Sequence, residues 1–228
     1  MRKSTILLAV LAALAVVVYS QRTALLERLM GRGMETRMSA NVIGDLQDGL
    51  HLALCGAGGP MPAPNASGPC VAVVAGNRLF VVDAGTDGLR NLGRMGYPPG
   101  DIEAVFLTHF HSDHIDGLGE MATIRWVSAA NGQPLPVYGP EGVQQVVEGF
   151  NASYAQDFVY RHDHHGDTVA PLSGAGMAAK PFPEPAMGEL ALLYDEADLK
   201  IEALAVDHAP VKPAVGYRCL LYTSDAAD

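Results

Sequence analysis

The stretch Thr108-His-Phe-His-Ser-Asp-His-Ile-Asp-Gly117 decides how the rest of this chain is interpreted. It directly follows Ile102 to Leu107, an apolar run that predicts a buried strand. Three imidazoles and a carboxylate fall within six residues of this loop: His109, His111, Asp113 and His114. Imidazole suits zinc and similar metals, and carboxylate suits harder ions. A solvated polar loop would account for one histidine here but not for this density, so the stretch predicts a metal site.

The spacing of these side chains predicts two metal ions rather than one. His109 and His111 are two residues apart, and side chains at that spacing on an extended segment point the same way, so both can share one ion. The chain then turns, and Asp113 and His114 can face a second ion. Two ions ~3.5–4 Å apart can hold a hydroxide nucleophile and clamp both reacting oxygens of a substrate.

The His-x-His-x-Asp-His pattern resembles the signature of the metallo-β-lactamase superfamily, and motif order extends the resemblance over roughly Leu50 to Arg218. Val81-Val-Asp-Ala-Gly85 is similar to that family's strand ending in an Asp-x-Gly turn. The resemblance implies that Asp83 supports the metal loop without binding metal. A turn-forming aspartate before Gly85 is compatible with that role.

Three further stretches resemble the ribonuclease Z and arylsulfatase-like branch of the superfamily: Leu54–Pro60, Leu135–Pro140 and Asp207–Arg218. The last of these implies that His208, a few residues before Gly-Tyr-Arg, is the third ligand of the first metal. Taken alone, His208 would be an ordinary histidine at the end of a strand. The glycines of the first stretch do not have the spacing of a dinucleotide-binding loop.

The resemblance implies a metal-dependent hydrolase that uses a metal-bound hydroxide on a phosphodiester, a sulfate ester or a related ester. Asp113 would then serve catalysis as well as metal binding. Two divalent ions are expected, with zinc favoured and Mn²⁺ or Fe²⁺ as alternatives. The competing hypothesis is a non-catalytic metal-binding module of the same fold, which would lack the later ligands of the branch.

The expected fold is an α/β sandwich of the metallo-β-lactamase αββα type, with mixed sheets. Apolar runs and turn residues predict strands at 51–55, 71–74, 79–82, 102–107, 135–138, 190–194, 199–205 and 215–218. Helices are predicted at 86–95, 117–130 and 141–150. A second histidine cluster, His162, His164 and His165, is predicted to be a loop or solvated turn. We expect His164 and His165 to contact substrate rather than to hold a further metal.

Net charge bounds the partners that we expect from the sequence. The 228 residues carry a formal charge of −10, and an acidic surface argues against binding driven by phosphate neutralisation. We therefore expect a small-molecule ester substrate and regard nucleic acid as unlikely. Membrane contact is expected only through the N-terminal segment, and nothing in the pattern indicates an oligomeric state.

Residues 1–20 have the pattern of a targeting segment. Arg2 and Lys3 precede an unbroken apolar run from Ile6 to Tyr19, which has the length of a signal-peptide core. A cleaved signal peptide and an uncleaved anchor are both consistent with it. Either places the protein outside the cytoplasm, in the periplasm or at the outer face of the cytoplasmic membrane. Residues 21–45 are expected to form a lead-in helix and linker.

The last ten residues, 219–228, resemble the in-frame translation of a sequencing adapter. The family domain is accordingly expected to occupy 46–218 and to be incomplete. The branch's bridging aspartate and final histidine do not follow Arg218, so we expect the chain as written to be inactive or nearly so.

Cys55 and Cys70 flank a loop rich in glycine and proline. Export would place them in an oxidising compartment, and the cysteine count is even once Cys219 is set aside. We predict a disulfide between them, with two buried thiols on neighbouring strands as the alternative.

Overall fold

The computed structural model describes residues 19–23, 41–61, 63–196 and 198–222. The chain divides into two compact units, Met1–Ala40 and Asn41–Asp228. Residues 19–23 of the first unit are helical. The predicted targeting segment, 1–20, lies outside the described residues except for its last two, and so does most of the lead-in helix predicted within 21–45. No helix in the described ranges is long and apolar enough to span a membrane.

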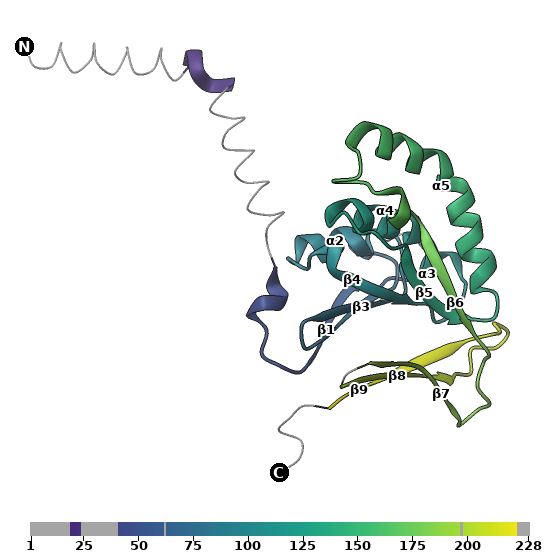
Figure 1. The fold of residues 1–228 in the computed structure, drawn as a ribbon. Coiled ribbons are helices and arrows are strands. Elements are labelled where there is room, and N and C mark those ends of the chain that lie inside the picture. The colour runs from purple at the N-terminus through teal and green to yellow at the C-terminus, as the bar shows by residue number, and fades with distance from the viewer. Residues whose placement is uncertain (1–18, 24–40, 62, 197, 223–228) are drawn as a thin grey trace, which may run out of the picture. The chain divides into compact units, whose positions relative to one another are not determined.

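The second unit contains two β-sheets and a layer of helices (Figure 1). Its strands are β1 Leu50–Gly56, β2 Cys70–Ala75, β3 Arg78–Val82, β4 Ile102–Phe106, β5 Leu135–Pro140, β6 Met177–Phe182, β7 Leu190–Glu196, β8 Leu199–Ala205 and β9 Val215–Leu221. Its α-helices are α2 Gly88–Arg94, α3 Ser112–Ile115, α4 Leu118–Ser128 and α5 Val143–His165. Short 3-10 helices occur at Val42–Asp45, Pro99–Asp101 and Leu172–Gly174.

The first sheet has six strands in the order β1-β2-β3-β4-β5-β6. Its first three strands are antiparallel, and β3 to β6 are parallel. The β2–β3 hairpin needs only Gly76 and Asn77 between the paired residues Ala75 and Arg78, and Gly76 has a φ of 59°. Two-residue hairpin turns require positive φ, which glycine adopts without strain. The parallel half brings the carboxyl ends of β3 and β4 to one edge, where the histidine loop begins.

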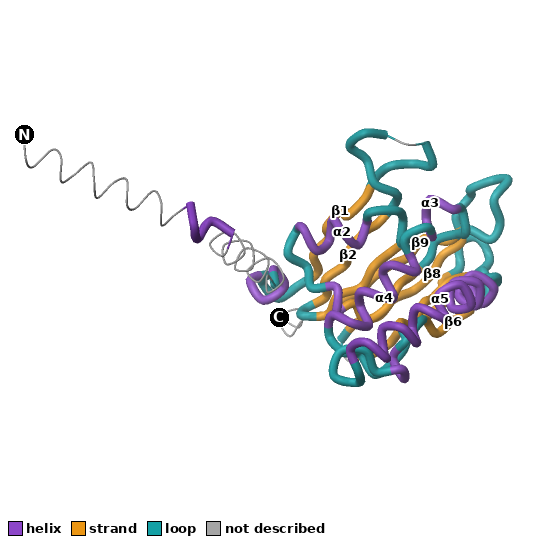
Figure 2. Tube along the Cα trace, turned by 90° about the horizontal axis from the view of Figure 1, so that it is seen from above, coloured by secondary structure: helices purple, strands orange, loops and turns teal. Residues whose placement is uncertain are grey.

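The second sheet is the antiparallel ribbon β7-β8-β9, and it packs against one face of the first. Leu199 and Ile201 of β8 are buried together with Phe80 and Phe106 of the first sheet. Along β8 every second residue is buried, which is the pattern of a strand with one face toward a core. The opposite face of the first sheet is covered by α2, α4 and α5 (Figure 2). Because both of its faces are covered, β4 is apolar almost throughout.

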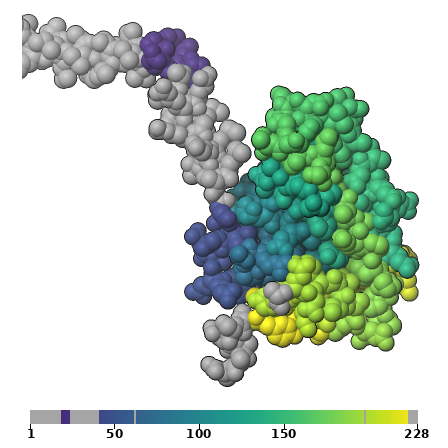
Figure 3. Space-filling model, viewed as in Figure 1, coloured from purple at the N-terminus to yellow at the C-terminus, as the bar shows by residue number. Residues whose placement is uncertain are grey.

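The layered arrangement confirms the predicted α/β sandwich with mixed sheets. A helical layer and two sheets lie within the described part of the chain. In the space-filling view, the green end of α5 lies far from the yellow strand β9, and the rest of α5 runs along the side of this unit (Figure 3). Residues Cys219 to Leu221, the start of the tail that the sequence sets apart, complete β9 and pair with β8. Residues 223–228 of that tail lie outside the described residues.

The structure differs from the sequence-based elements at α5 and β6. The helix expected at 141–150 continues to His165, because apolar side chains recur at helical spacing well beyond Phe150. Tyr154 and Phe158 continue this row, and the Phe158 ring contacts the buried Trp126 with centroids 5.8 Å apart. Strand β6 was not expected at all. It is short and contains Pro181, but six residue pairs join it to β5 as an edge strand.

Candidate metal centre

The loop after β4 holds His109 and His111 on the same side. His111 has extended backbone angles, φ −62° and ψ 146°, and immediately precedes α3. The Nε2 atom of His109 lies 3.0 Å from Nδ1 of His111. The structure therefore brings these two predicted ligands together, as the two-residue spacing on an extended segment requires.

His208 joins this pair from a different part of the fold. It lies in the loop between β8 and β9, and its ring centroid is 4.7 Å from that of His109 and 5.7 Å from that of His111. One nitrogen from each of the three imidazoles can be chosen so that all lie within 4.8 Å of one another. His109 is buried, whereas His111 and His208 are exposed. The cluster thus combines a fixed inner ligand with two ligands open to solvent.

Asp113 and His114 lie on the single turn of α3, next to the three-histidine cluster. The rings of His109 and His114 have centroids 4.1 Å apart. The Nε2 atom of His114 lies 3.8 Å from Oδ2 of Asp113. That these two side chains hold a second ion stays a prediction.

Asp83 lies beneath the histidine loop and is 5% exposed. Its Oδ1 accepts the backbone N–H of Thr108 at 2.8 Å, and its Oδ2 accepts the Thr108 hydroxyl at 2.8 Å. Oδ2 also lies 2.7 Å from Nδ1 of His114. A carboxylate that receives the Nδ1 proton leaves Nε2 of that imidazole free to bind metal. Asp83 thus has the contacts of an orienting residue, and its support of a metal ligand stays a prediction.

Three glycines allow the backbone of the metal loop to touch the turn after β3. A Cβ atom built at Gly85 would lie 2.4 Å from the Asp113 carbonyl oxygen, and one at Gly68 would lie 2.7 Å from the same atom. A Cβ at Gly117 would lie 2.7 Å from the carbonyl oxygen of Gly85. Hydrogen bonds from Ala84 N–H to the His114 carbonyl and from Gly117 N–H to the Ala84 carbonyl close the contact. Because these glycines have no Cβ atom, the backbone around α3 can pack directly against the turn after β3.

The pKa values of His109 and His114 are shifted in opposite directions by burial and by neighbouring charge. Desolvation, and then the neighbouring His114, lowers the pKa of His109 to about 4. Burial also acts to lower the pKa of His114, but the hydrogen bond and negative charge of Asp83 outweigh it and raise that pKa. His109 is therefore a neutral imidazole at neutral pH. Asp83 holds the His114 ring through its Nδ1 atom.

The donor set fits divalent metal. Three imidazoles with converging nitrogens, followed by an imidazole and a carboxylate, are the ligands that zinc and similar ions take in catalytic sites. The buried member of the set is neutral, which metal binding requires. Cys55 and Cys70 lie outside this set and form a disulfide with a Cα separation of 5.0 Å, which confirms the predicted pairing.

The second histidine cluster does not form the predicted loop. His162, His164 and His165 occupy the last turn of α5. His162 bonds to the Ala170 carbonyl through Nδ1, and the exposed rings of His164 and His165 stack with centroids 4.4 Å apart. None of these contacts reaches the His109 cluster. Contact of His164 and His165 with substrate stays a prediction.

The sequence reasoning passed over two residues that contact the loop. The Thr108 hydroxyl lies 3.0 Å from Nδ1 of His109 as well as bonding Asp83. The Tyr217 hydroxyl donates to the carbonyl of Leu107 from the second sheet. Thr108 could have been noticed because it directly precedes His109. Tyr217 has no local signal of this kind, since its partner lies 110 residues away.

Comparison with known proteins identifies relatives over most of this unit. The model of the metallo-beta-lactamase superfamily matches residues 64–226. Ribonuclease Z of Mycobacterium bovis is 36% identical over 173 residues, which cover 74% of this chain and 58% of that protein. Ribonuclease Z of Mycobacterium marinum is 34% identical over the same shares. The chain therefore spans a little over half the length of these curated relatives.

Solved structures share the fold. Human tRNase Z, short form, superposes with a TM-score of 0.55 at 18% identity, covering 75% of this chain and 64% of that one. A diphosphatase of the PhnP family gives a TM-score of 0.53 at 18% identity, covering 75% and 62%. At this identity the likeness extends to the fold alone.

The relatives overturn one expectation from the sequence. We expected a small-molecule ester substrate and regarded nucleic acid as unlikely, but the curated relatives are ribonucleases and solved neighbours include tRNase Z proteins. The expectation was wrong because it rested on the formal charge of −10. A net charge averages over the whole surface, whereas nucleic acid is bound by local basic groups.

Proposed function

Because this chain belongs to the metallo-β-lactamase superfamily, we propose that it is a metal-dependent phosphodiesterase that cleaves RNA. The observation that carries the proposal is the convergence of His109, His111 and His208 beside Asp113 and His114. The ribonuclease Z names of the curated relatives supply the substrate class. The relatives are longer than this chain, so the proposal concerns the protein at its natural length.

The residues of the site divide into ligands and supports. His109, His111 and His208 would hold the first ion, and Asp113 and His114 the second. A bound metal pair would supply Lewis-acid stabilisation of the phosphoryl oxygens and lower the pKa of the attacking water. Asp83 keeps the Nδ1 proton of His114 and fixes Thr108, so the ligands do not reorganise when substrate arrives.

The loop that carries His208 also presents a positive charge. Lys212 is exposed four residues after His208. A lysine on the same loop as a candidate metal ligand suits an RNA phosphate, because backbone phosphates attract cations irrespective of sequence. This local cation supports RNA as the substrate despite the acidic balance of the whole chain.

The test compares RNA with simpler esters. The full-length protein, loaded with Zn²⁺ or Mn²⁺, is incubated with a transcribed precursor tRNA, with bis-p-nitrophenyl phosphate and with p-nitrophenyl sulfate. We expect metal-dependent cleavage of the RNA that is lost in His109→Ala. Hydrolysis of the aryl sulfate with intact RNA would overturn the substrate class. Absence of any metal-dependent hydrolysis would overturn the enzymatic proposal and favour a binding module.

Export is a separate proposal, supported by residues 1–20 alone. Arg2, Lys3 and the apolar run behind them have the composition of a secretory signal. An exported enzyme of this kind would meet RNA outside the cytoplasm. Fusing residues 1–45 to alkaline phosphatase, which is active only after export, tests the idea. An inactive fusion that accumulates in the cytoplasm would contradict it, and Arg2→Glu with Lys3→Glu serves as the control.

A further inference from the structure

The position of His208 depends on how the two sheets meet. His109 and His111 follow β4 of the first sheet, whereas His208 lies between β8 and β9 of the second. One nitrogen of each ring nonetheless lies within 4.8 Å of a nitrogen of each of the other two. Any contact that fixes β9 against the end of β4 therefore also fixes the geometry of the three-histidine cluster.

Two consecutive carbonyl groups just before His109 accept hydrogen bonds from β9. The Thr108 carbonyl accepts the backbone N–H of Val215 at 2.9 Å. The Leu107 carbonyl accepts the hydroxyl of Tyr217. The first bond is made by backbone and is open to almost any residue at position 215. The second is made by the side chain, because the phenol carries its donor at the far end of a ring that reaches from β9 to the Leu107 carbonyl.

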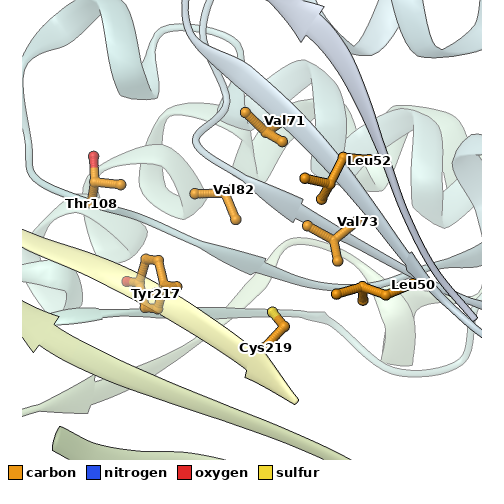
Figure 4. A pocket seen from close by; sticks show the side chains of 8 residues that line it. All are labelled: Leu50, Leu52, Val71, Val73, Val82, Thr108, Tyr217 and Cys219. Atoms are coloured by element: carbon orange, nitrogen blue, oxygen red, sulfur yellow. The ribbon is translucent and has the colours of Figure 1, made fainter. Parts of the chain in front are cut away.

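The Tyr217 ring packs against Phe182 of β6, with ring centroids 6.5 Å apart, as well as against Phe106 of β4. It meets the Phe106 ring edge to face, with centroids 5.3 Å apart. Its other surroundings include an apolar cavity of about 280 Å³, which Val82, Thr108 and Cys219 also line (Figure 4). Side chains beside a cavity can shift because they lack close contacts there. The ring packing is not directional, whereas the hydroxyl bond joins β9 to one defined peptide group next to the histidine loop.

The Tyr217 hydroxyl is a dependable donor. Burial, and then the negative charge of Asp83, raises the pKa of Tyr217 well above its ordinary value. The phenol therefore keeps its proton at neutral pH. The Tyr217 hydroxyl donates its proton to the carbonyl of Leu107. The backbone N–H of Leu107 donates in turn to the Tyr138 carbonyl of β5.

From this geometry we infer that Tyr217 is a positioning residue for the metal centre, holding His208 in register with His109 and His111 through the Leu107 carbonyl. It touches no metal ligand directly. Its contribution is to lock β9 to the peptide group two residues before His109. Displacements of ~0.5 Å in such supporting groups are enough to loosen a ligand set.

The test measures metal binding without RNA. This inference rests on the metal site of the proposed function but not on its substrate, so Co²⁺ is titrated into the chain and its visible absorption is recorded. Tyr217→Phe removes the donor and keeps the ring. Tyr217→4-fluorophenylalanine also keeps the volume of the hydroxyl, and it replaces Tyr217→Phe if that variant unfolds. Tyr194→Phe is the matched control, because its hydroxyl bonds Glu196 at 2.9 Å, among the strands and away from the histidines.

We expect Co²⁺ binding to weaken by about 10–100-fold in the Tyr217 variants, the effect of losing an outer-shell partner. The absorption band should change shape, and Tyr194→Phe should bind Co²⁺ like the wild type. In a His208→Ala background the Tyr217 substitution should have no further effect. Unchanged Co²⁺ affinity, or an equal loss in the His208→Ala background, would overturn the inference. Failure of the wild-type chain to bind Co²⁺ would instead overturn the metal site of the proposed function.

Discussion

Asp83 and His114 are 31 residues apart in sequence, and Oδ2 of the first lies 2.7 Å from Nδ1 of the second. This contact links the turn after β3 to the turn of α3. It gives the metal loop a defined imidazole orientation before any ion is present. Hydrogen bonds of this kind govern how much of a metal site is already organised in the folded chain.

Substitution of the buried histidine should remove the first ion. We expect His109→Ala to abolish metal-dependent hydrolysis and to leave less than one tightly bound ion per chain, because the inner ligand of the cluster is lost. Metal content by atomic emission, together with RNA cleavage, measures this. His51→Ala is the control, because His51 lies on β1 and its ring bonds the Gln47 carbonyl. Equal metal content and activity in the His109 variant and the wild type would refute the ligand assignment.

Loss of Asp83 should be milder than loss of a ligand. Asp83→Ala removes the acceptor of the Thr108 and His114 protons but leaves every ligand in the chain. We expect metal affinity to fall by about 10–100-fold, with residual activity at saturating Zn²⁺. Competition with a chromophoric chelator gives the affinity. A loss as complete as that of His109→Ala would show that Asp83 binds metal itself.

A methyl group at Gly85 should disturb the second ion. It would lie 2.4 Å from the Asp113 carbonyl oxygen and 2.4 Å from the Gly68 carbonyl carbon, so backbone must move. We expect Gly85→Ala to destabilise the fold by about 1–3 kcal/mol and to weaken binding of the second equivalent of metal. Gly93→Ala is the control, because nothing lies within 4 Å of its Cβ and it sits in helix α2. Indistinguishable unfolding curves for the two variants would contradict the predicted contact.

The pH dependence of metal binding should follow His114 rather than His109. His109 has a pKa of about 4, so protons compete with metal there only in acid. The pKa of His114 is raised above its ordinary 6.5, so its proton competes as pH falls through that higher value. We expect Asp83→Asn to lower the pKa of His114 in the metal-free protein, because the hydrogen bond and charge that raise it are gone. NMR titration of the histidine ring signals measures this, and an unchanged pKa of His114 would exclude Asp83 as its cause.

The same shifts set the stability of the metal-free protein. A buried neutral His109 stabilises the fold fully above the unfolded pKa of 6.5, and this contribution is lost as pH falls toward about 4. The His114–Asp83 pair acts in the opposite sense. Its contribution is complete below 6.5 and is lost as pH rises through the raised pKa of His114. Urea unfolding of His109→Asn and His114→Asn across this range separates the two.

The disulfide should leave one thiol to react. Denatured but unreduced protein is expected to titrate with a single free thiol, that of Cys219. Replacing Cys55 and Cys70 by serine opens a bridge with a sequence separation of 15. We expect this to lower the free energy of unfolding by ~3 kcal/mol. Three reactive thiols in the wild-type protein would disprove the pairing.

The metal loop could be predicted because its information is local. Four ligands fall within six residues, and strand alternation places His109 beside His111. His208 was assigned only through its resemblance to a longer motif, since nothing near it in sequence indicates its partners. The length of α5 was misjudged because Asn151 and Ser153 interrupt the apolar row with weak helix formers, although Asn151 bonds the backbone of Met177 in β6. The contact of Tyr217 with Leu107 depends on how two sheets meet, which no local pattern specifies.

The ligands of the three-histidine cluster come from both sheets, and His208 follows His109 by 208 − 109 = 99 residues. An ion held there would therefore act as a reversible cross-link between two distant parts of the chain. Closing a loop of about 100 residues restricts the unfolded chain by an amount worth ~4.7 kcal/mol in the chain-entropy description of cross-links. Metal supply would then govern how long the molecule survives proteolysis as well as whether it turns over substrate. The ion that serves catalysis would then also stabilise the fold.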